Sequence, residues 1–350
     1  MATGTRRGRS GGPLVVARLS STPVERPSTV IPPWPGRQVT AAGAPVYVRS
    51  TPPTGPDPEP ALYVHGLAGA STNWTDFAAT LSPWLDGEAI DLPGFGKAGA
   101  SPQRMYSIAS NAAVVIDYIE RRGRGPVHLF GNSMGGAISI RVAARRPDLV
   151  RTLTLISPAV PDLRPRRPGP DMAMVLLLVP GAGSVARRRL DALTPHQRAR
   201  GTIELCFAHP SRVPPQRLAE AVADVQARNE LPWAMEAFTR SLRGIVADYV
   251  APGRRSPFAA MRTISAPTLV VWGQQDRLVD VSLAPRVARA IPDARLLVLP
   301  DVGHVAQLED SVTTARAFLG LLEDVRARTD AIQNGSDRPL DLTPGSQPTA

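Results

Sequence analysis

The sequence predicts an α/β fold in which a mostly parallel sheet is covered by helices on both faces. Short, nearly continuous apolar segments recur along the chain, as expected for strands that are buried on both faces. Most of them alternate with longer stretches of helical composition, which is typical of parallel sheets. With 350 residues, 43% of them hydrophobic, the chain has room for one large core and a modest insertion. The candidate strands are residues 60–64, 88–91, 127–130, 153–156, 267–273 and 294–300.

Residues 1–38 are interpreted as a flexible basic leader, because they are rich in Pro, Gly, Ser and Arg and show no sustained periodicity. Six arginines stand there against Glu25 alone, a net +5 of the chain's +10. Arg6-Arg7 resembles the start of a twin-arginine export signal, but the apolar stretch 13–17 behind it is too short for a signal sequence. We therefore expect a cytoplasmic protein.

The basic balance lacks the pattern of a nucleic-acid-binding protein. Lys97 is the only lysine, and no basic stripe alternates with aromatic residues, so the arginine excess indicates GC-rich coding. The single cysteine, Cys206, cannot form an intrachain disulfide, and no Cys/His cluster has the spacing of metal ligands. We predict no nucleic-acid partner, no stable membrane insertion, no metal and no organic cofactor.

The first two candidate strands are each followed by a loop. Residues 60–64 lead into His65-Gly66-Leu67, and residues 88–91 lead into the loop 92–96. The carboxyl ends of parallel strands form the edge of the sheet at which α/β sites lie. We expect both loops to border such a site, with His65 and Gly66 next to the substrate. The alternative for His65-Gly66 is a tight turn with no further role.

The most informative segment is Gly131-Asn132-Ser133-Met134-Gly135-Gly136. It joins the apolar segment 127–130 to a helical segment, 137–146, which Pro147 stops. A serine at a sharp turn between a buried strand and a helix matches the G-x-S-x-G nucleophile elbow, which exposes the serine hydroxyl. Glycines flank the serine because a Cβ would collide where strand and helix cross. Ser133 is the predicted nucleophile, and the alternative is an ordinary strand-to-helix loop.

A serine that attacks an acyl carbon needs backbone N–H donors for the oxyanion that forms. The N–H of Met134, at the start of the helix, is one candidate. The N–H of Leu67, in the loop after the first candidate strand, is the other. We predict that these two groups form the oxyanion hole.

A carboxylate and an imidazole follow the last two candidate strands. Asp276 lies just beyond residues 267–273, and His304 lies just beyond residues 294–300. The chain order Ser, Asp, His is that of G-x-S-x-G hydrolases. In that arrangement the histidine takes the serine proton and the carboxylate fixes the histidine tautomer. Two alternatives stay open for the acid: Asp276 could only cap the next helix, or Asp280 could take its role.

The remaining histidines are weaker candidates for the base. His128 lies inside a candidate strand and is interpreted as a core residue. His196 and His209 fall in a Pro- and Arg-rich region and are interpreted as solvated.

Residues 161–256 interrupt the alternation of strands and helices after the strand 153–156. Helical stretches at 215–229 and 233–247 indicate a helical cap. The apolar run 172–179 within it is too short to span a bilayer, which takes about 20 residues. This run is interpreted as cap core, or alternatively as the lining of an acyl pocket.

Together these motifs resemble the α/β-hydrolase family. They are His65-Gly66 and residues 91–96, 131–136, 272–276 and 303–304, and the resemblance covers about residues 39–326. The segment 131–136 is also similar to serine-dependent C–C bond hydrolases of aromatic-ring degradation. Leu67-Ala68 and Leu308 depart from that narrower pattern, which has a Gly-Gly or Gly-Pro type of loop and a Trp there. Epoxide hydrolases and haloalkane dehalogenases use a carboxylate nucleophile, whereas this chain has Ser133.

The resemblance implies a hydrolase core at 39–160 and 257–326, with the cap at 161–256 between its halves. We expect residues 327–350 to be a disordered tail. The implied reaction is hydrolysis of an apolar carboxylic ester, as in carboxylesterases and lipases, through an acyl-enzyme on Ser133. The same residues would also suit C–C bond hydrolysis, thioester hydrolysis, acyl transfer or a low-turnover ligand-binding receptor. The sequence does not predict an oligomeric state.

Overall fold

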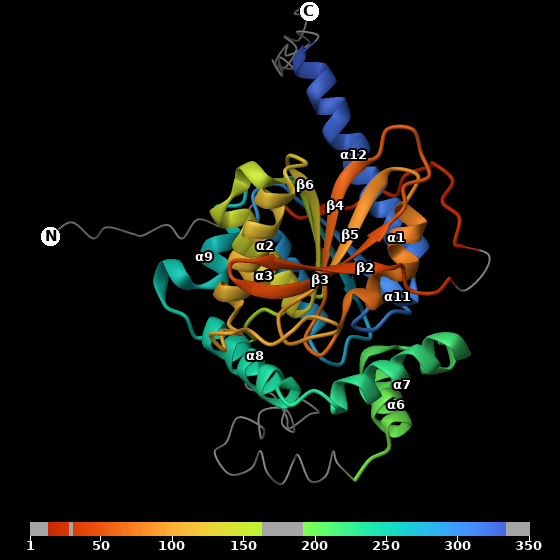
Figure 1. Ribbon diagram of the computed structural model, residues 1–350. Coiled ribbons are helices and arrows are strands. Elements are labelled where there is room, and N and C mark those ends of the chain that lie inside the picture. Colours follow the sequence, from red (N-terminus) through yellow and green to blue (C-terminus); the bar gives the residue numbers. More distant parts are fainter. Residues whose placement is uncertain (1–12, 28–30, 163–191, 334–350) are drawn as a thin grey trace, which may run out of the picture.

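The computed structural model of the protein describes residues 13–27, 31–162 and 192–333 (Figure 1). These residues form a nine-stranded sheet in the order β1-β9-β8-β7-β6-β4-β5-β3-β2. The strands are β1 Val15–Val16, β2 Gly36–Ala41, β3 Ala44–Thr51, β4 Glu59–Val64, β5 Leu85–Asp91, β6 Val127–Asn132, β7 Val150–Ile156, β8 Thr268–Gly273 and β9 Ala294–Leu299. All six strands expected from the sequence are present as β4 to β9.

Along the sheet order, neighbouring strands pair in parallel from β1 through β9, β8, β7, β6 and β4 to β5, whereas β3 pairs antiparallel with both β5 and β2. Every residue of β6 and β8 is buried, which explains why these strands are nearly continuous apolar runs. The predicted fold class is therefore confirmed. The antiparallel pair β2–β3 was not identified from the sequence, because its residues do not form such a run.

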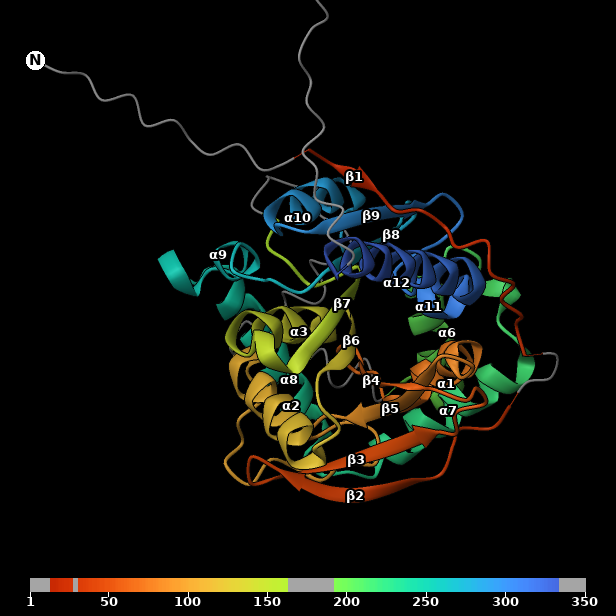
Figure 2. The ribbon, with the colours of Figure 1, turned by 90° about the horizontal axis from the view of Figure 1, so that it is seen from above.

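Helices cover both faces of the sheet (Figure 2). One layer contains α2 Ile108–Arg122, α3 Met134–Arg145, α9 Pro257–Met261 and α10 Ala284–Ala290. The other contains α1 Thr75–Leu81, α11 Ala306–Glu309 and α12 Ser311–Gln333. Under this second layer Tyr63, Phe77, Phe130 and Phe318 form a fully buried aromatic cluster, with ring centroids 4.8–6.2 Å apart.

Part of the expected flexible leader is ordered against the sheet. β1 pairs with β9 in parallel, and the Ala17 N–H donates to the Leu296 carbonyl at 2.8 Å. Farther on, the Ser20 N–H donates to the Arg316 carbonyl of α12 at 2.9 Å. A Cβ at Gly320 would collide with the carbonyl of residue 18, so the chain lies directly on the helix. The expectation of a flexible leader is wrong here because backbone groups at the sheet edge and on α12, which need no apolar pattern, hold the chain.

The C-terminal helix also extends beyond the expected boundary. α12 continues to Gln333, whereas we expected disorder from residue 327. The hydrogen bond from the Thr329 hydroxyl to the Val325 carbonyl, at 3.1 Å, lies in this extension. Residues 327–331 of the extension are exposed, so the composition of the sequence did not reveal that the helix continues here.

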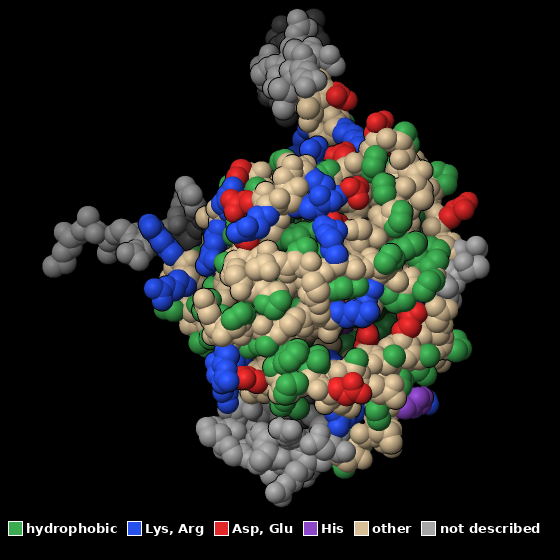
Figure 3. Space-filling view, in the orientation of Figure 1, with side chains coloured by type: hydrophobic (Ala, Val, Ile, Leu, Met, Phe, Trp, Pro, Cys, Tyr) green, Lys and Arg blue, Asp and Glu red, His purple; other side chains and the backbone are tan. Residues whose placement is uncertain are grey.

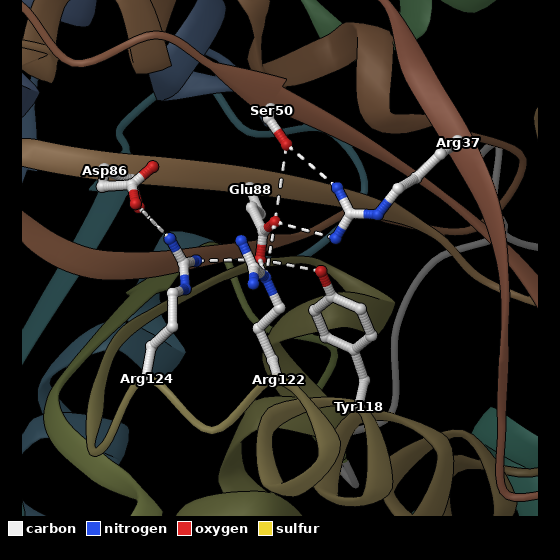
Figure 4. Close-up of polar contacts among 7 residues, drawn as sticks. All are labelled: Arg37, Ser50, Asp86, Glu88, Tyr118, Arg122 and Arg124. Atoms are coloured by element: carbon white, nitrogen blue, oxygen red, sulfur yellow. Dashed lines mark hydrogen bonds and ion pairs between the residues drawn. The ribbon is translucent and has the colours of Figure 1, made fainter.

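A buried glutamate ties β5 to the α2 side of the sheet (Figure 4). The side chain of Glu88 is 1% exposed and accepts the Tyr118 hydroxyl at 2.7 Å. Arg124 and Arg122 donate to its carboxylate at 2.8 and 3.1 Å, and Arg37 lies at 3.3 Å. Burial alone would raise the pKa of Glu88, but Arg124, Tyr118 and Arg122 outweigh it, and the pKa lies below its ordinary value. Glu88 is therefore ionised in the folded protein.

The described part of the expected cap, residues 192–256, contains α6 Pro195–Cys206, α7 Pro215–Asn229 and α8 Ala234–Tyr249. These helices lie over one end of the sheet, at the bottom of Figure 1. Contacts with the loops after β4 and β9 place them at the carboxyl ends of the parallel strands. The apolar run 172–179 lies outside the described residues. No helix among the described residues is both long and apolar enough to cross a bilayer.

Basic and acidic side chains are interspersed on the face shown in Figure 3. Several arginines are paired: Arg18 with Glu323 at 2.7 Å, and Arg217 with Asp76 at 2.6 Å. The expected lack of a nucleic-acid partner stays a prediction.

Candidate active site

Ser133 lies at a strained turn between β6 and α3. Its φ of 54° and ψ of −117° are unusual for a residue with a side chain. A Cβ at Gly131 would lie 2.5 Å from the Gly135 carbonyl oxygen, and one at Gly135 would collide with the Val64 carbonyl. Ser133 itself is partly exposed. The flanking glycines thus allow strand and helix to cross closely, which is the steric reason inferred from the sequence.

The structure brings Asp276 and His304 together. His304 Nδ1–H donates to Asp276 Oδ2 at 2.9 Å, and both side chains are buried, at 4% and 0% exposure. The other carboxylate oxygen, Oδ1, accepts the N–H groups of Leu278 and Val279 at 2.8 and 2.9 Å. The carboxylate therefore caps the following turn and orients the imidazole at the same time.

Asn132, the residue before Ser133, links the elbow to the loop between β9 and α11 that carries His304, here called the histidine loop. Its Nδ2 donates to the Ile156 carbonyl at 3.1 Å and to the His304 carbonyl at 3.0 Å. Within the described ranges no hydrogen bond joins the Ser133 hydroxyl to His304. Asn132 thus fixes the backbone of His304 beside the elbow, and Ser133, Asp276 and His304 all lie at the carboxyl edge of the sheet.

The rival candidates have other partners. Asp280 accepts the Ser282 N–H at 2.8 Å and caps the short 3₁₀ helix Val281–Leu283. His128 is buried in β6, where Nδ1 lies 2.8 Å from the Thr152 hydroxyl and Nε2 lies 3.2 Å from Glu59. Burial lowers the pKa of His128, so the ring is neutral in the core.

The loop after β4 lies against Ser133. A Cβ at Gly66 would lie 3.1 Å from the Ser133 Cβ, so Gly66 is packed on the elbow and places the next residue, Leu67, beside it. Met134 is the first residue of α3, and its N–H therefore has no acceptor within the helix. These positions are compatible with the two predicted oxyanion donors.

The side chain of His65 binds the main chain of two loops, and its expected place next to the substrate stays a prediction. Its Nδ1–H donates to the Gly66 carbonyl at 2.7 Å, and its Nε2 accepts the Leu92 N–H at 3.0 Å. The side chain is buried, and burial lowers the pKa of the ring. Both nitrogens are used by the main chain, so His65 shapes the turn and joins the loops after β4 and β5.

The cap contacts the same loop. Arg228 of α7 donates from Nη1 to the Ala68 carbonyl at 2.8 Å, next to Leu67. Ala68 has a positive φ of 59°, so this carbonyl belongs to a turn that an alanine seldom adopts. On the neighbouring helical turn, Asp224 accepts the Thr72 hydroxyl at 3.1 Å. Sequence reasoning missed Arg228, because the carbonyl it binds lies 160 residues away.

Burial raises the pKa of the Cys206 thiol to about 12, which makes it a poor nucleophile near neutrality. No group of three or more His, Cys, Asp or Glu side chains in the described ranges is arranged to hold a metal ion.

Comparison with known proteins identifies the family. A family model for the alpha/beta hydrolase fold matches residues 60–311, well over half of the chain. The chain belongs to the α/β-hydrolase family. Its elbow, its histidine loop and its cap lie within the matched region.

Two curated proteins to which the chain is similar carry the names of different enzymes. The monoacylglycerol lipase ABHD6 of Mus musculus is 27% identical over 266 residues, with 75% of each chain covered. The dihydrolipoyllysine-residue acetyltransferase component of an acetoin cleaving system from Pseudomonas putida is 29% identical over 266 residues. That match covers 75% of this chain but only 63% of the acetyltransferase component. The names of these two relatives therefore do not indicate one common reaction.

Solved structures agree on the fold. The 2-hydroxy-6-oxo-6-phenylhexa-2,4-dienoate hydrolase from Rhodococcus sp. strain RHA1 superposes with a TM-score of 0.66 at 20% identity. The match covers 82% of this chain and 98% of that one. At this identity the likeness shows the α/β-hydrolase fold alone.

Proposed function

We propose that this hydrolase cleaves an apolar carboxylic ester through an acyl-enzyme on Ser133. The observation that carries the proposal is the Asp276–His304 pair, bonded at 2.9 Å and attached through Asn132 to the strained elbow of Ser133. The lipase among the curated relatives supports an ester as substrate. On the sequence grounds given above, we propose that the reaction takes place in the cytoplasm.

In the proposed acylation step, His304 Nε2 takes the proton of the Ser133 hydroxyl as the oxygen attacks the ester carbonyl carbon. Asp276 keeps the ring proton on Nδ1 and stabilises the imidazolium that forms. The backbone N–H groups of Leu67 and Met134 donate to the developing oxyanion. The imidazolium then protonates the departing alkoxide, which leaves as an alcohol.

In the deacylation step, water replaces the alcohol. His304 removes a proton from this water, which attacks the acyl carbon, and the same oxyanion donors stabilise the second tetrahedral intermediate. Collapse of the intermediate returns the proton to Ser133 and releases the carboxylic acid. No step requires a metal or an organic cofactor.

The test compares the wild-type protein with the Ser133→Ala variant on a panel of p-nitrophenyl esters of increasing acyl length. We expect steady ester turnover from the wild type and a loss of about 10⁶-fold in kcat for the variant, as in a serine protease that lacks its nucleophile. Thioesters and ring-fission dienes in the same panel test the other reactions of these residues. A faster reaction with a diene than with every ester would replace the proposed function by C–C bond hydrolysis.

A further inference from the structure

The histidine loop is attached to the end of cap helix α6. The His304 N–H donates to the Cys206 carbonyl at 2.7 Å, and a Cβ at Gly303 would lie 2.5 Å from that carbonyl oxygen. In the neighbouring loop, Arg277 donates from Nη1 to the Glu204 carbonyl at 2.9 Å. The last carbonyl groups of a helix have no partner within it, so the end of α6 offers free acceptors to the loops that carry Asp276 and His304.

A single carboxylate adds a further link between the end of α6 and the histidine loop. Glu309, at the end of α11, accepts the Gly303 N–H on Oε1 at 2.7 Å and the Ala208 N–H on Oε2 at 2.8 Å. Gly303 directly precedes His304, and Ala208 lies just beyond α6, 101 residues away from Glu309 in sequence. Each oxygen therefore holds one of the two segments. Hydrogen bonds to an ionised acceptor are about twice as strong as neutral ones.

The side chain of Glu309 is too far along the chain from its cap partner for sequence patterns to reveal the contact. Its surroundings favour a structural and electrostatic role over direct chemistry, because both oxygens already accept backbone N–H groups. Burial raises the pKa of Glu309, while the Gly303, Ala208 and His209 amides oppose that change. The His209 ring and the Cys206 thiol are titratable groups on the cap side that interact electrostatically with its carboxylate.

We propose that Glu309 is a positioning residue that makes the placement of His304 depend on the docked position of the cap. This inference rests on the proposed function of Ser133 and His304. When α6 is docked, Glu309 bridges it to the histidine loop and the Cys206 carbonyl holds the His304 amide. When the bridge is broken, the loop loses one of its attachments, and Nε2 of His304 moves relative to the serine.

The Glu309→Gln variant separates this role from simple packing. Glutamine has nearly the same shape but only one oxygen, so it can accept one of the two N–H groups while its NH₂ faces the other donor. A displacement of about 1 Å can lower the rate about 10²-fold without touching the reacting atoms. We therefore expect kcat for a short ester to fall about 10²-fold while KM changes little, because the substrate does not contact Glu309.

The matched control is Glu204→Gln, in the last turns of α6. The Glu204 side chain is 58% exposed and pairs only with Arg200 among the described residues, while its carbonyl contact is unaffected by the change. Hydrogen–deuterium exchange measured by mass spectrometry is the second readout. We expect faster exchange in the peptides around residues 303–305 and 206–209 of the Glu309 variant, and unchanged exchange there in the control.

Wild-type kcat in the Glu309→Gln variant would overturn the inference, as would a loss of activity accompanied by faster exchange throughout the sheet. If the variant does not fold, Glu309→Asp keeps the charge but reaches only one amide, and kcat should again fall at constant KM. A fluorophosphonate probe distinguishes failure of this inference from failure of the proposed function. The probe should label every folded variant that retains Ser133, more slowly where Glu309 is changed, whereas an unlabelled wild type would refute the proposed function itself.

Discussion

Replacing Asp276 with asparagine tests how the buried carboxylate controls the imidazole, because the backbone dictates how the new amide must lie. Oδ1 accepts the N–H groups of Leu278 and Val279 at 2.8 and 2.9 Å, while Oδ2 accepts Nδ1–H of His304 at 2.9 Å. The single oxygen of asparagine stays with the two N–H groups, since the opposite orientation sets an NH₂ group against two donors. Its NH₂ group then faces Nδ1 of His304.

In that orientation Nδ1 must accept a hydrogen bond, so the proton of the neutral ring moves to Nε2. A protonated Nε2 cannot take the proton of Ser133. The corresponding change in a serine protease lowers kcat by about 10⁴, which equals about 5.5 kcal/mol of activation free energy. We expect a loss of this size here, with the fold intact, because the shape of the side chain and the two bonds to Oδ1 are retained.

The assay is kcat for an activated ester at neutral pH, together with thermal unfolding followed by circular dichroism. Asp280→Asn is the matched control: the amide oxygen can still accept the Ser282 N–H, and kcat should stay near the wild-type value. If the Asp276 variant keeps more than about a tenth of the wild-type kcat, the tautomer argument fails. If Asp280→Asn proves the more damaging change, the acid is Asp280.

Three further predictions follow from the same structure. Glu88→Gln should lower the free energy of unfolding by about 3 kcal/mol in a urea titration. Because the pKa of Glu88 lies below its ordinary value of 4.5, the ionised carboxylate stabilises the fold above that pH, and this stabilisation is lost as the pH falls through the depressed pKa. If the free energy of unfolding depends on acid pH in the same way in the wild type and in the Gln variant, this reasoning is wrong. Gly135→Ala should prevent folding or activity, because its Cβ collides with a carbonyl of β4. Gly201→Ala, in open space on α6, should instead stabilise the protein by about 0.5–1 kcal/mol. Equal melting temperatures for the two variants would refute the steric argument. His304→Ala should abolish turnover of an activated ester, whereas a folded His128→Ala variant should keep it, because the His128 ring lies in the core against Thr152 and Glu59. Equal losses in the two folded variants would exclude His304 as the base.

The sequence predicts most of what positions the candidate site, for a physical reason. Strands buried on both faces are apolar runs that the sequence reveals, and the carboxyl ends of parallel strands meet at one edge of the sheet. The sequence alone therefore predicted that Ser133, Asp276 and His304 lie at that edge. The role of the glycines around Ser133 was also predictable from the sequence, because a close crossing of β6 and α3 requires residues without a Cβ.

Contacts made through the backbone were not predictable. The segment with β1 and Ser20 is held by carbonyl groups of Leu296 and Arg316, which any residue type could supply. The ring of His65 binds the Gly66 carbonyl and the Leu92 amide, and neither partner is marked by its side chain.

The same limit applies to the partners of the histidine loop. Asn132 binds the carbonyl of His304, and Glu309 binds the amides of Gly303 and Ala208. A carboxylate five residues after a histidine has no distinctive spacing of its own. Its role becomes visible only when the fold brings the end of α6 onto the loop.

The central claim is that Ser133 is the nucleophile, and mapping a covalent adduct tests it most directly. The full-length protein is treated with a fluorophosphonate probe, digested and analysed by peptide mass spectrometry, beside the Ser133→Ala variant. We predict one probe molecule per chain, attached to Ser133, and no adduct on the variant. An adduct on another residue, or a folded wild-type protein that stays unlabelled at a large excess of probe, would contradict the account.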